Sequence, residues 1–124
     1  MHGGTILKIL DQVAFTCASR WARQYVVTLS VDRVTFREPV HIGELVTFDA
    51  SVNYTGTTSM EVGIRVTTED VRQLSRRHTN SCYFTMVALD EERRPVPVPR
   101  LELRDEDQRR RWREAEERRA QRRR

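Results

Sequence analysis

One carboxylate stands out because of its position within a helix-forming stretch. The stretch HGGTILKILDQVAF, residues 2–15, places two glycines before an apolar helical pattern that has Asp11 in its middle. On a helical wheel the polar side chains gather on one arc, and Asp11 projects about 60° away from Lys8, toward the apolar face. A partly desolvated carboxylate at an interface can act as a general base. Helix geometry alone also allows Asp11 to pair with Lys8 and face solvent.

The helix that carries Asp11 is predicted from residue 5 to about residue 23, with Thr5 as its N-cap. Its apolar face is broad and is centred on Ile6, Leu10, Val13 and Cys17. A strip of small side chains borders Asp11, and it consists of Ala14, Ala18 and Ala22. We expect this strip to let another backbone or a ligand approach the helix closely.

Four strands are predicted after this helix, at residues 26–36, 45–55, 60–68 and 78–89. The first strand places Val27, Leu29 and Val31 on one face and then changes phase, which predicts a bulge near Asp32 and Arg33.

The next two strands alternate between apolar and polar residues, so each has one buried face. In the second strand this face is expected to hold Val46, Phe48, Ala50, Val52 and Tyr54, and in the third Met60, Val62, Ile64 and Val66. The fourth strand is apolar on both parities, as in a central strand.

A helix followed by a mostly antiparallel sheet is an α+β pattern. One long helix lying across a curved antiparallel sheet is the hotdog arrangement.

The positive charge of the chain is concentrated at its C-terminal end. The 124 residues carry a net charge of +4, and residues 105–124 hold nine arginines and six acidic residues. The segment is predicted to be a charged helix that follows an extended, proline-rich arm at residues 93–100. We therefore divide the chain into a hotdog domain, residues 1–103, and an Arg/Glu-rich helical tail, residues 104–124. The interspersed acids and near-neutral body argue against a nucleic-acid partner.

The composition also argues against other classes of protein. No run of about 18 apolar residues is present, so we expect no membrane span, and the N-terminus lacks the pattern of a secretory signal. Cys17 and Cys82 lie in apolar runs, as buried thiols do in a reducing cytosol, which predicts a cytoplasmic location. The scattered histidines, His2, His41 and His78, predict no metal site.

Five segments, in this order, resemble the hotdog-fold acyl-CoA thioesterases of the cytosolic acyl-CoA hydrolase family. They are HGGTILKILDQVAFTCASRWA, VVTLSVDRVTFREPVHIGELV, TGTTSMEVGIRV, RHTNSCYFTMVALD and PVPVPRL. The similarity runs from residue 2 to about residue 103. It implies an enzyme that hydrolyses acyl-CoA to a free fatty acid and CoA, with no cofactor because CoA is part of the substrate.

The resemblance implies a catalytic role for Asp11, as a general base on water or as a nucleophile on the thioester carbonyl. Gly3 and Gly4 would let the thioester oxygen approach free N–H groups at the helix N-terminus. Gly4 and Asp11 are about 10 Å apart along one helix axis, so one carbonyl cannot easily contact both. We therefore expect a site shared across a homodimer, with the alanine strip facing the partner or the acyl chain. The family commonly assembles further, into tetramers or hexamers.

The resemblance also implies contacts to CoA. They come from Leu29, Ser30 and Val31 on the first strand, Thr58, Ser59 and Met60 at a hairpin, and Arg118 and Arg119 in the tail. Arginines suit phosphates because they donate two hydrogen bonds at once. Other roles stay open at this point: Leu29 and Val31 as core residues, Ser59 as a turn residue, and the arginines as part of a solvated charge run.

Members of this family usually have a further segment before the paired glycines, which supplies a strand and an asparagine that positions the carbonyl or the water. In this sequence His2 stands directly before Gly3. On this pattern we expect the strand and the asparagine to be missing, either because the start of the sequence is misassigned or truncated or because the protein lacks them. His2 could serve as a substitute donor, but a terminal residue is usually disordered. The missing asparagine favours an alternative function, a non-hydrolytic protein that binds acyl-CoA or an acyl carrier.

Overall fold

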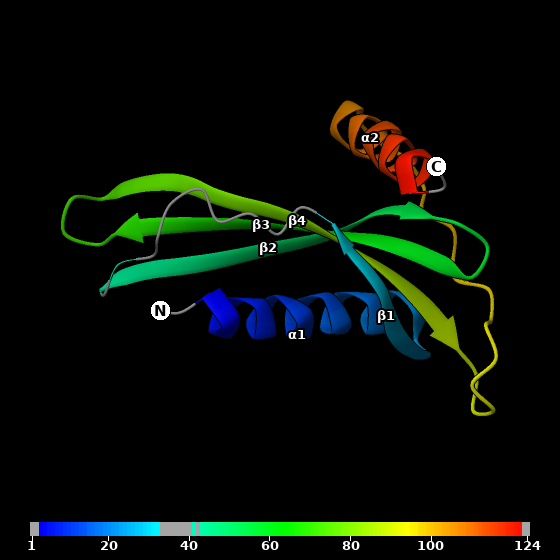
Figure 1. Cartoon of the computed structure of the whole chain (residues 1–124). Helices are drawn as coiled ribbons and strands as arrows, with labels where there is room; N and C mark the ends of the chain where they lie inside the picture. Colours follow the sequence, from blue (N-terminus) through cyan, green and yellow to red (C-terminus); the bar gives the residue numbers. More distant parts are fainter. Residues whose placement is uncertain (1–2, 33–40, 42, 123–124) are drawn as a thin grey trace.

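The computed structural model describes residues 3–32, 41 and 43–122. In chain order the elements are α1 (Gly3–Ala22), β1 (Tyr25–Asp32), β2 (Glu44–Thr55), β3 (Ser59–Asp70), β4 (Ser75–Leu89) and α2 (Glu106–Arg122). The strands form one antiparallel sheet in the order β1-β4-β3-β2. Helix α1 lies along one face of this sheet and α2 lies on the other side (Figure 1). The predicted α+β hotdog fold with a charged C-terminal helix is confirmed.

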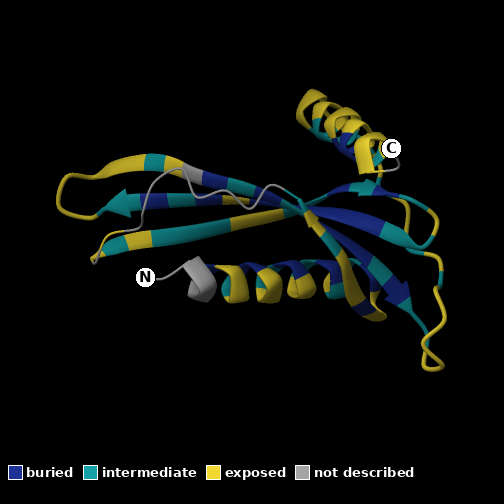
Figure 2. Cartoon of the chain, in the orientation of Figure 1, coloured by how far each residue is buried: buried dark blue, intermediate teal, exposed yellow. Residues whose placement is uncertain are grey.

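Helix α1 packs on the sheet through a stripe of residues four positions apart. The stripe consists of Ile6, Leu10, Ala14, Ala18 and Ala22, which are all buried. The prediction that the three alanines face a partner or an acyl chain is therefore wrong, because their small side chains let the helix backbone lie close to the sheet. The opposite side of α1 is exposed (Figure 2). The helix begins at Gly3, so Thr5 lies inside the helix and is not its N-cap.

Strand β1 has the opposite phase to the predicted one. Val26 is buried, whereas Val27, Leu29 and Val31 are exposed, with Leu29 at 69%. The register shifts between Thr28 and Ser30, which moves the bulge away from Asp32 and Arg33. β1 is an edge strand whose more apolar face is left uncovered, so alternation alone could not tell which face packs on α1. Residues 33–36 of the predicted strand lie outside the described residues.

Strand β2 changes face near its end. Val46, Phe48 and Val52 pack against the core as predicted. The register then shifts between Val52 and Tyr54, so Tyr54 pairs with Glu61 instead of continuing the buried face. Ala50, also assigned to that face, is exposed. The residues predicted for the buried face of β3 are all buried: Met60, Val62, Ile64 and Val66.

The proline-rich arm runs in an extended form between β4 and α2, as predicted. Hydrogen bonds connect it to β4, to the turn between β2 and β3, and to α1. Val96 N–H donates to the carbonyl of Ala88 at 3.0 Å, and Val98 N–H donates to Thr57 at 2.9 Å. The indole N–H of Trp21 on α1 donates to the arm at the Pro99 carbonyl, at 2.7 Å. The division of the chain at residues 103 and 104 stays a prediction.

Both cysteines are free thiols. Burial raises the pKa of Cys82 to about 12 and raises that of Cys17 above its usual value. Cys82 is therefore protonated at neutral pH and does not act as a nucleophile. Neither described helix is long and apolar enough to cross a bilayer. Over residues 3–32, 41 and 43–122, no group of three His, Cys, Asp or Glu side chains could hold a metal ion.

Gly63 gives a test of packing on the outer face of the sheet. A Cβ at this position would lie 2.2 Å from Nδ2 of Asn53, whose amide is held by Glu61. We expect Gly63→Ala to lower the free energy of unfolding by about 2 kcal/mol, because Asn53 must move out of a packed network. Urea denaturation measures this loss.

Gly56→Ala is the control for this experiment. Its Cβ would lie 2.9 Å from Nη1 of Arg119 and from the Ser59 hydroxyl, which are the ends of side chains that can move. The loss of stability should therefore be smaller than for Gly63→Ala, and an equal loss would contradict this account.

Candidate active site

Asp11 lies on the flank of α1 that faces strand β1. The Thr28 hydroxyl donates a hydrogen bond to Oδ1 of Asp11 at 3.2 Å, and the same hydroxyl oxygen is 3.4 Å from the sulfur of Met86. Thr28 points toward α1 because it pairs with the buried Met86 on β4. The hydrogen bond fixes one carboxylate oxygen and leaves Asp11 exposed. Such a carboxylate is oriented and can receive a proton.

Two exposed apolar side chains lie on either side of Asp11 along the helix. Leu7 is 42% exposed and Phe15 is 49% exposed, and each is four residues from Asp11, on the same face of the helix. Within the described residues, Lys8 forms no ion pair with Asp11. The ion pair that helix geometry allowed is therefore not found. Asp11 is nevertheless exposed, as that alternative predicted, so a single chain does not show the partly desolvated carboxylate.

Gly3 and Gly4 form the first turn of α1. They lie on the same continuous helix as Asp11 and about 10 Å from it along the axis, at 1.5 Å per residue. One protomer therefore does not bring the paired glycines and Asp11 together around one small group.

A pocket on the opposite face of the sheet collects several of the predicted CoA contacts. This outer pocket has a volume of about 220 Å³. It is lined by Leu29, Tyr54, Ser59, Met60, Glu61, Thr85, Ala115, Arg119 and Arg122. Four of these residues were predicted as CoA contacts from three separate segments. The others, Ser30, Val31, Thr58 and Arg118, do not line it, and their contacts to CoA stay predictions.

Aromatic and cationic side chains form the part of the outer pocket near α2. Nη1 of Arg119 donates to the Tyr54 hydroxyl at 3.0 Å, and the Tyr54 ring lies 4.3 Å from the ring of Trp112, centroid to centroid. Arg122 at the end of α2 pairs with Asp32 at the end of β1. Helix α2 and the sheet thus enclose the pocket between them.

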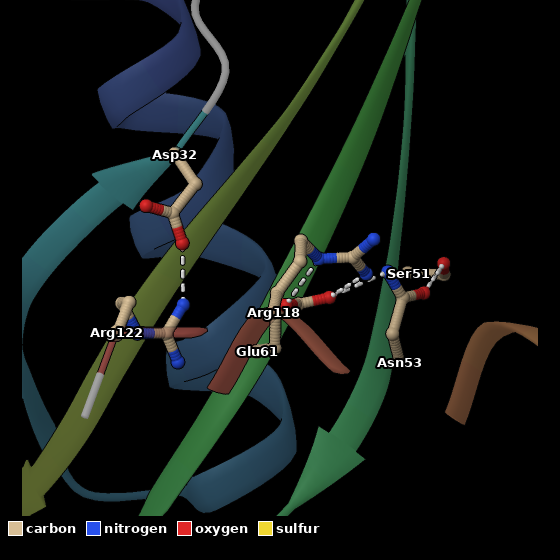
Figure 3. A network of polar contacts seen from close by, with 6 residues as sticks. All are labelled: Asp32, Ser51, Asn53, Glu61, Arg118 and Arg122. Carbon is tan, nitrogen blue, oxygen red and sulfur yellow. Dashed lines mark hydrogen bonds and ion pairs between the residues drawn. The ribbon is translucent and has the colours of Figure 1, made fainter. Parts of the chain in front are cut away.

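Beside the outer pocket lies a buried ion pair, which Figure 3 shows. Arg118 donates to both carboxylate oxygens of Glu61, at 2.6 and 2.9 Å. The Asn53 amide donates to Glu61 at 3.2 Å, and the guanidinium of Arg118 stacks 3.5 Å from the centre of the Tyr83 ring. Burial lowers the pKa of Arg118, but the hydrogen bonds and charge of Glu61 outweigh burial and raise it. Arg118 thus has an internal partner and is not part of a solvated charge run.

The Asp11 carboxylate and the outer pocket meet at strand β1. Thr28 bonds to Asp11 on the inner face, and the next residue, Leu29, lines the outer pocket. The bulge between Thr28 and Ser30 leaves Leu29 unpaired on β4 and largely exposed. The Asp11 carboxylate and the outer pocket therefore lie on opposite faces of the same edge strand.

A larger groove runs along the other flank of α1, beside β2. It has a volume of about 570 Å³ and is lined by Ile9, Gln12, Val13, Thr16, Cys17, Arg20, Trp21, Ala50 and Val52. None of the predicted site residues lines it. We therefore place the candidate site on the β1 side of α1, where the oriented carboxylate lies.

Reasoning from sequence missed six residues of this site: Thr28, Tyr54, Glu61, Thr85, Ala115 and Arg122. Thr28 carries a weak signal, because it is a polar residue two positions from the buried Val26. Glu61 lies at an outward position of an alternating strand, where an acidic residue indicates solvent. Its burial depends on Arg118, 57 residues away, and no local pattern reports such a pairing.

Comparison with known proteins identifies the class of protein. The family model of the thioesterase superfamily matches residues 1–75. The chain therefore belongs to the thioesterase superfamily.

Individual relatives have more specific names than the superfamily does. The chain is 52% identical over 112 residues to protein VdlD of Helicobacter pylori, a match that covers 90% of this chain and 64% of VdlD. It is 34% identical over 116 residues to the cytosolic acyl coenzyme A thioester hydrolase of Rattus norvegicus, covering 92% of this chain and 30% of that protein. The chain thus spans less than two thirds of the length of either relative.

Solved structures with the same fold include acyl-CoA hydrolases. The acyl-CoA hydrolase from Bacillus cereus has a TM-score of 0.94 and 39% identity, with 98% of this chain and 74% of that chain covered. An apo-hexameric acyl-CoA thioesterase has a TM-score of 0.94 and 35% identity, covering 99% and 79%. The acyl-CoA hydrolase from Staphylococcus aureus, in complex with butyryl coenzyme A, has a TM-score of 0.91 and 34% identity, covering 99% and 75%.

The buried ion pair predicts an asymmetry between single and double variants. Arg118→Met should lower the free energy of unfolding by about 3–5 kcal/mol, because it leaves the Glu61 carboxylate buried without its cation. The double variant Glu61→Leu with Arg118→Met removes both charges and should be closer in stability to the wild type. Chemical denaturation of the three proteins measures both effects. A double variant less stable than Arg118→Met would contradict this expectation.

Proposed function

We propose that this protein hydrolyses acyl-CoA thioesters to a free fatty acid and CoA. The observation that carries the proposal is the oriented, exposed Asp11 carboxylate beside Thr28, directly across β1 from a pocket that holds Ser59 and Arg119. An acyl-CoA has a reactive thioester at one point of a long chain and phosphates at the other end. A carboxylate and a cationic pocket on neighbouring faces suit these two parts.

In the proposed reaction Asp11 acts as a general base. It takes a proton from water, the water oxygen attacks the thioester carbonyl carbon, and the carbonyl oxygen becomes an oxyanion. When the C–S bond breaks, the proton on Asp11 passes to the leaving CoA sulfur, which gives the acid and CoA. Thr28 holds the carboxylate in the orientation that this transfer needs. In the alternative mechanism an Asp11 oxygen attacks the carbonyl carbon, and the C–S bond breaks as CoA leaves as a thiolate. Water then hydrolyses the mixed anhydride to the free acid, which restores Asp11 and supplies the proton that CoA takes up.

The oxyanion requires donors that the same protomer does not bring near Asp11. We propose that Gly3 and Gly4 of a second protomer supply their N–H groups, at the positive end of the partner's α1 dipole. The exposed apolar residues around Asp11 and on β1 are consistent with such an interface. They are Leu7, Phe15, Tyr25, Val27, Leu29 and Val31. A homodimer is then the minimal active unit, and the hexameric relative is consistent with further assembly into tetramers or hexamers.

The outer pocket is proposed to hold part of CoA beyond the thioester. Leu29 at the bulge lies where the substrate would pass from the outer pocket to Asp11. The names of the relatives support the same substrate class, since they include acyl-CoA hydrolases and a complex with butyryl coenzyme A. The cytosolic relative supports a cytoplasmic location. No cofactor takes part in the proposed reaction.

The first test of this function replaces the carboxylate by an amide. Asp11→Asn should lower kcat for butyryl-CoA by about 100-fold or more, because the amide cannot accept the proton. Release of CoA is measured with a thiol reagent. The control is Asp107→Asn, an exposed acid on α2 that should leave kcat unchanged.

Each outcome of this test has a clear meaning. Unchanged turnover in Asp11→Asn would rule out the role of Asp11. Binding of acyl-CoA by the wild type without thiol release would instead support the non-hydrolytic alternative.

The second test concerns Thr28. Thr28→Val keeps the shape of the side chain and removes its hydrogen bond to Asp11. We expect kcat to fall by about tenfold with a smaller change in KM, since a hydrogen bond to a charged group of this kind contributes about 1.5–3 kcal/mol. Steady-state kinetics with thiol detection separates the two constants. A variant that changes only KM would contradict an orienting role.

A further inference from the structure

We propose that Glu61 is a positioning residue, which acts through Arg118 to hold α2 so that Arg119 faces the phosphates of CoA. This inference rests on the proposed function and extends it to substrate affinity. Glu61 itself is expected to contact no substrate atom that reacts. Its effect is confined to the end of the substrate that is remote from the thioester.

The first step is the way in which α2 is attached to the sheet. Helix α2 is strongly charged and buries only Ala115 and Arg118. Glu61 is 3% exposed and receives two hydrogen bonds from Arg118, so this pair is a buried polar contact between α2 and the sheet. A bidentate pair fixes direction as well as distance. The pair therefore sets both the place and the rotation of α2 on the sheet.

The second step is the charge of the residue next to Arg118. Arg119 and Arg122 both line the outer pocket. Arg122 is neutralised by Asp32, whereas Arg119 contacts the Tyr54 hydroxyl and ring and has no acidic partner among the described residues. Arg119 is therefore a cation with capacity for an anionic ligand. Its backbone is adjacent to Arg118, so the Glu61–Arg118 pair fixes the place from which its side chain starts, while Tyr54 contacts its guanidinium.

The third step is an independent sign of a ligand in the same pocket. Thr85 also lines the outer pocket and is 8% exposed, and its buried hydroxyl oxygen has no hydrogen-bond partner within the described part of the chain. Thr85 pairs with Glu61 across β3 and β4, so the two residues lie side by side on this face. A buried hydroxyl without a partner is unfavourable unless a ligand or water satisfies it. Among the residues that the structure describes, this pocket thus combines a cation without an acidic partner, Arg119, with a hydroxyl without a hydrogen-bond partner, Thr85.

The test compares two substrates that share the acyl group and thioester. One is butyryl-CoA, and the other is S-butyryl-pantetheine, which lacks the nucleotide and its phosphates. Glu61→Gln should raise KM for butyryl-CoA by about tenfold with kcat nearly unchanged, because Arg119 loses its fixed position on the phosphates. The same variant should leave kcat/KM for S-butyryl-pantetheine unchanged. A merely structural role would lower activity on both substrates.

Two further variants complete the experiment. Glu117→Gln removes an exposed acid from the same helix and should change neither substrate. Gly56→Ala leaves the Glu61–Arg118 pair intact but places a Cβ 2.9 Å from Nη1 of Arg119, so it should reproduce the selective loss for butyryl-CoA. If Glu61→Gln fails to fold, Gly56→Ala still tests the contact between Arg119 and the phosphates on which the role of Glu61 depends, and equal losses on both substrates would overturn the proposal.

The outcomes separate this inference from the proposed function. Equal losses on both substrates in Glu61→Gln, with thiol release by the wild type intact, would overturn the role of Glu61 and leave the hydrolase standing. If the wild type releases no thiol, the proposed function fails, and calorimetric binding of CoA then tests Glu61 alone. Weaker CoA binding by Glu61→Gln than by Glu117→Gln would support the positioning role, and equal binding would overturn it.

Discussion

The close approach of α1 to the sheet is the constraint on which the rest of this structure depends. Three alanines, Ala14, Ala18 and Ala22, occupy the buried stripe where larger residues would hold the helix away. At this short separation the flank of α1 reaches the level of the edge strand, and Asp11 meets the Thr28 hydroxyl. Longer side chains in the stripe would lift the carboxylate off β1. The small residues are thus required by geometry within one chain, before any partner is considered.

Much of the fold could be predicted from periodicity, and the two main errors have different causes. The helices, the four strands and the inward residues of β3 follow from local patterns that report burial on one face. The pattern failed on β1 because the more apolar face of this edge strand is left uncovered, and it failed at Tyr54 because a bulge shifts the register. The candidate site was found in part through a family resemblance. Its remaining members, such as Glu61, depend on partners more than 50 residues away.

The two faces of the sheet carry different kinds of residues. The inner face has the helix, the apolar core and the oriented carboxylate, whereas the outer face has a polar network from Ser51 and Asn53 to Glu61. A buried ion pair often adds little net stability, because desolvation of both charges offsets their attraction. What the Glu61–Arg118 pair does provide is a single orientation for a helix that has little apolar surface of its own.

The outer pocket is lined by residues from distant parts of the chain, so these residues are synthesised at different times. Asp32 and Arg122, which pair beside the pocket, are 90 residues apart in sequence. The core of α1 and the sheet involves residues that leave the ribosome well before α2 does. The inner face that carries Asp11 and Thr28 can therefore fold before α2 covers the outer pocket. The lining of the outer pocket is complete only after α2 has been synthesised, because α2 supplies Ala115, Arg119 and Arg122.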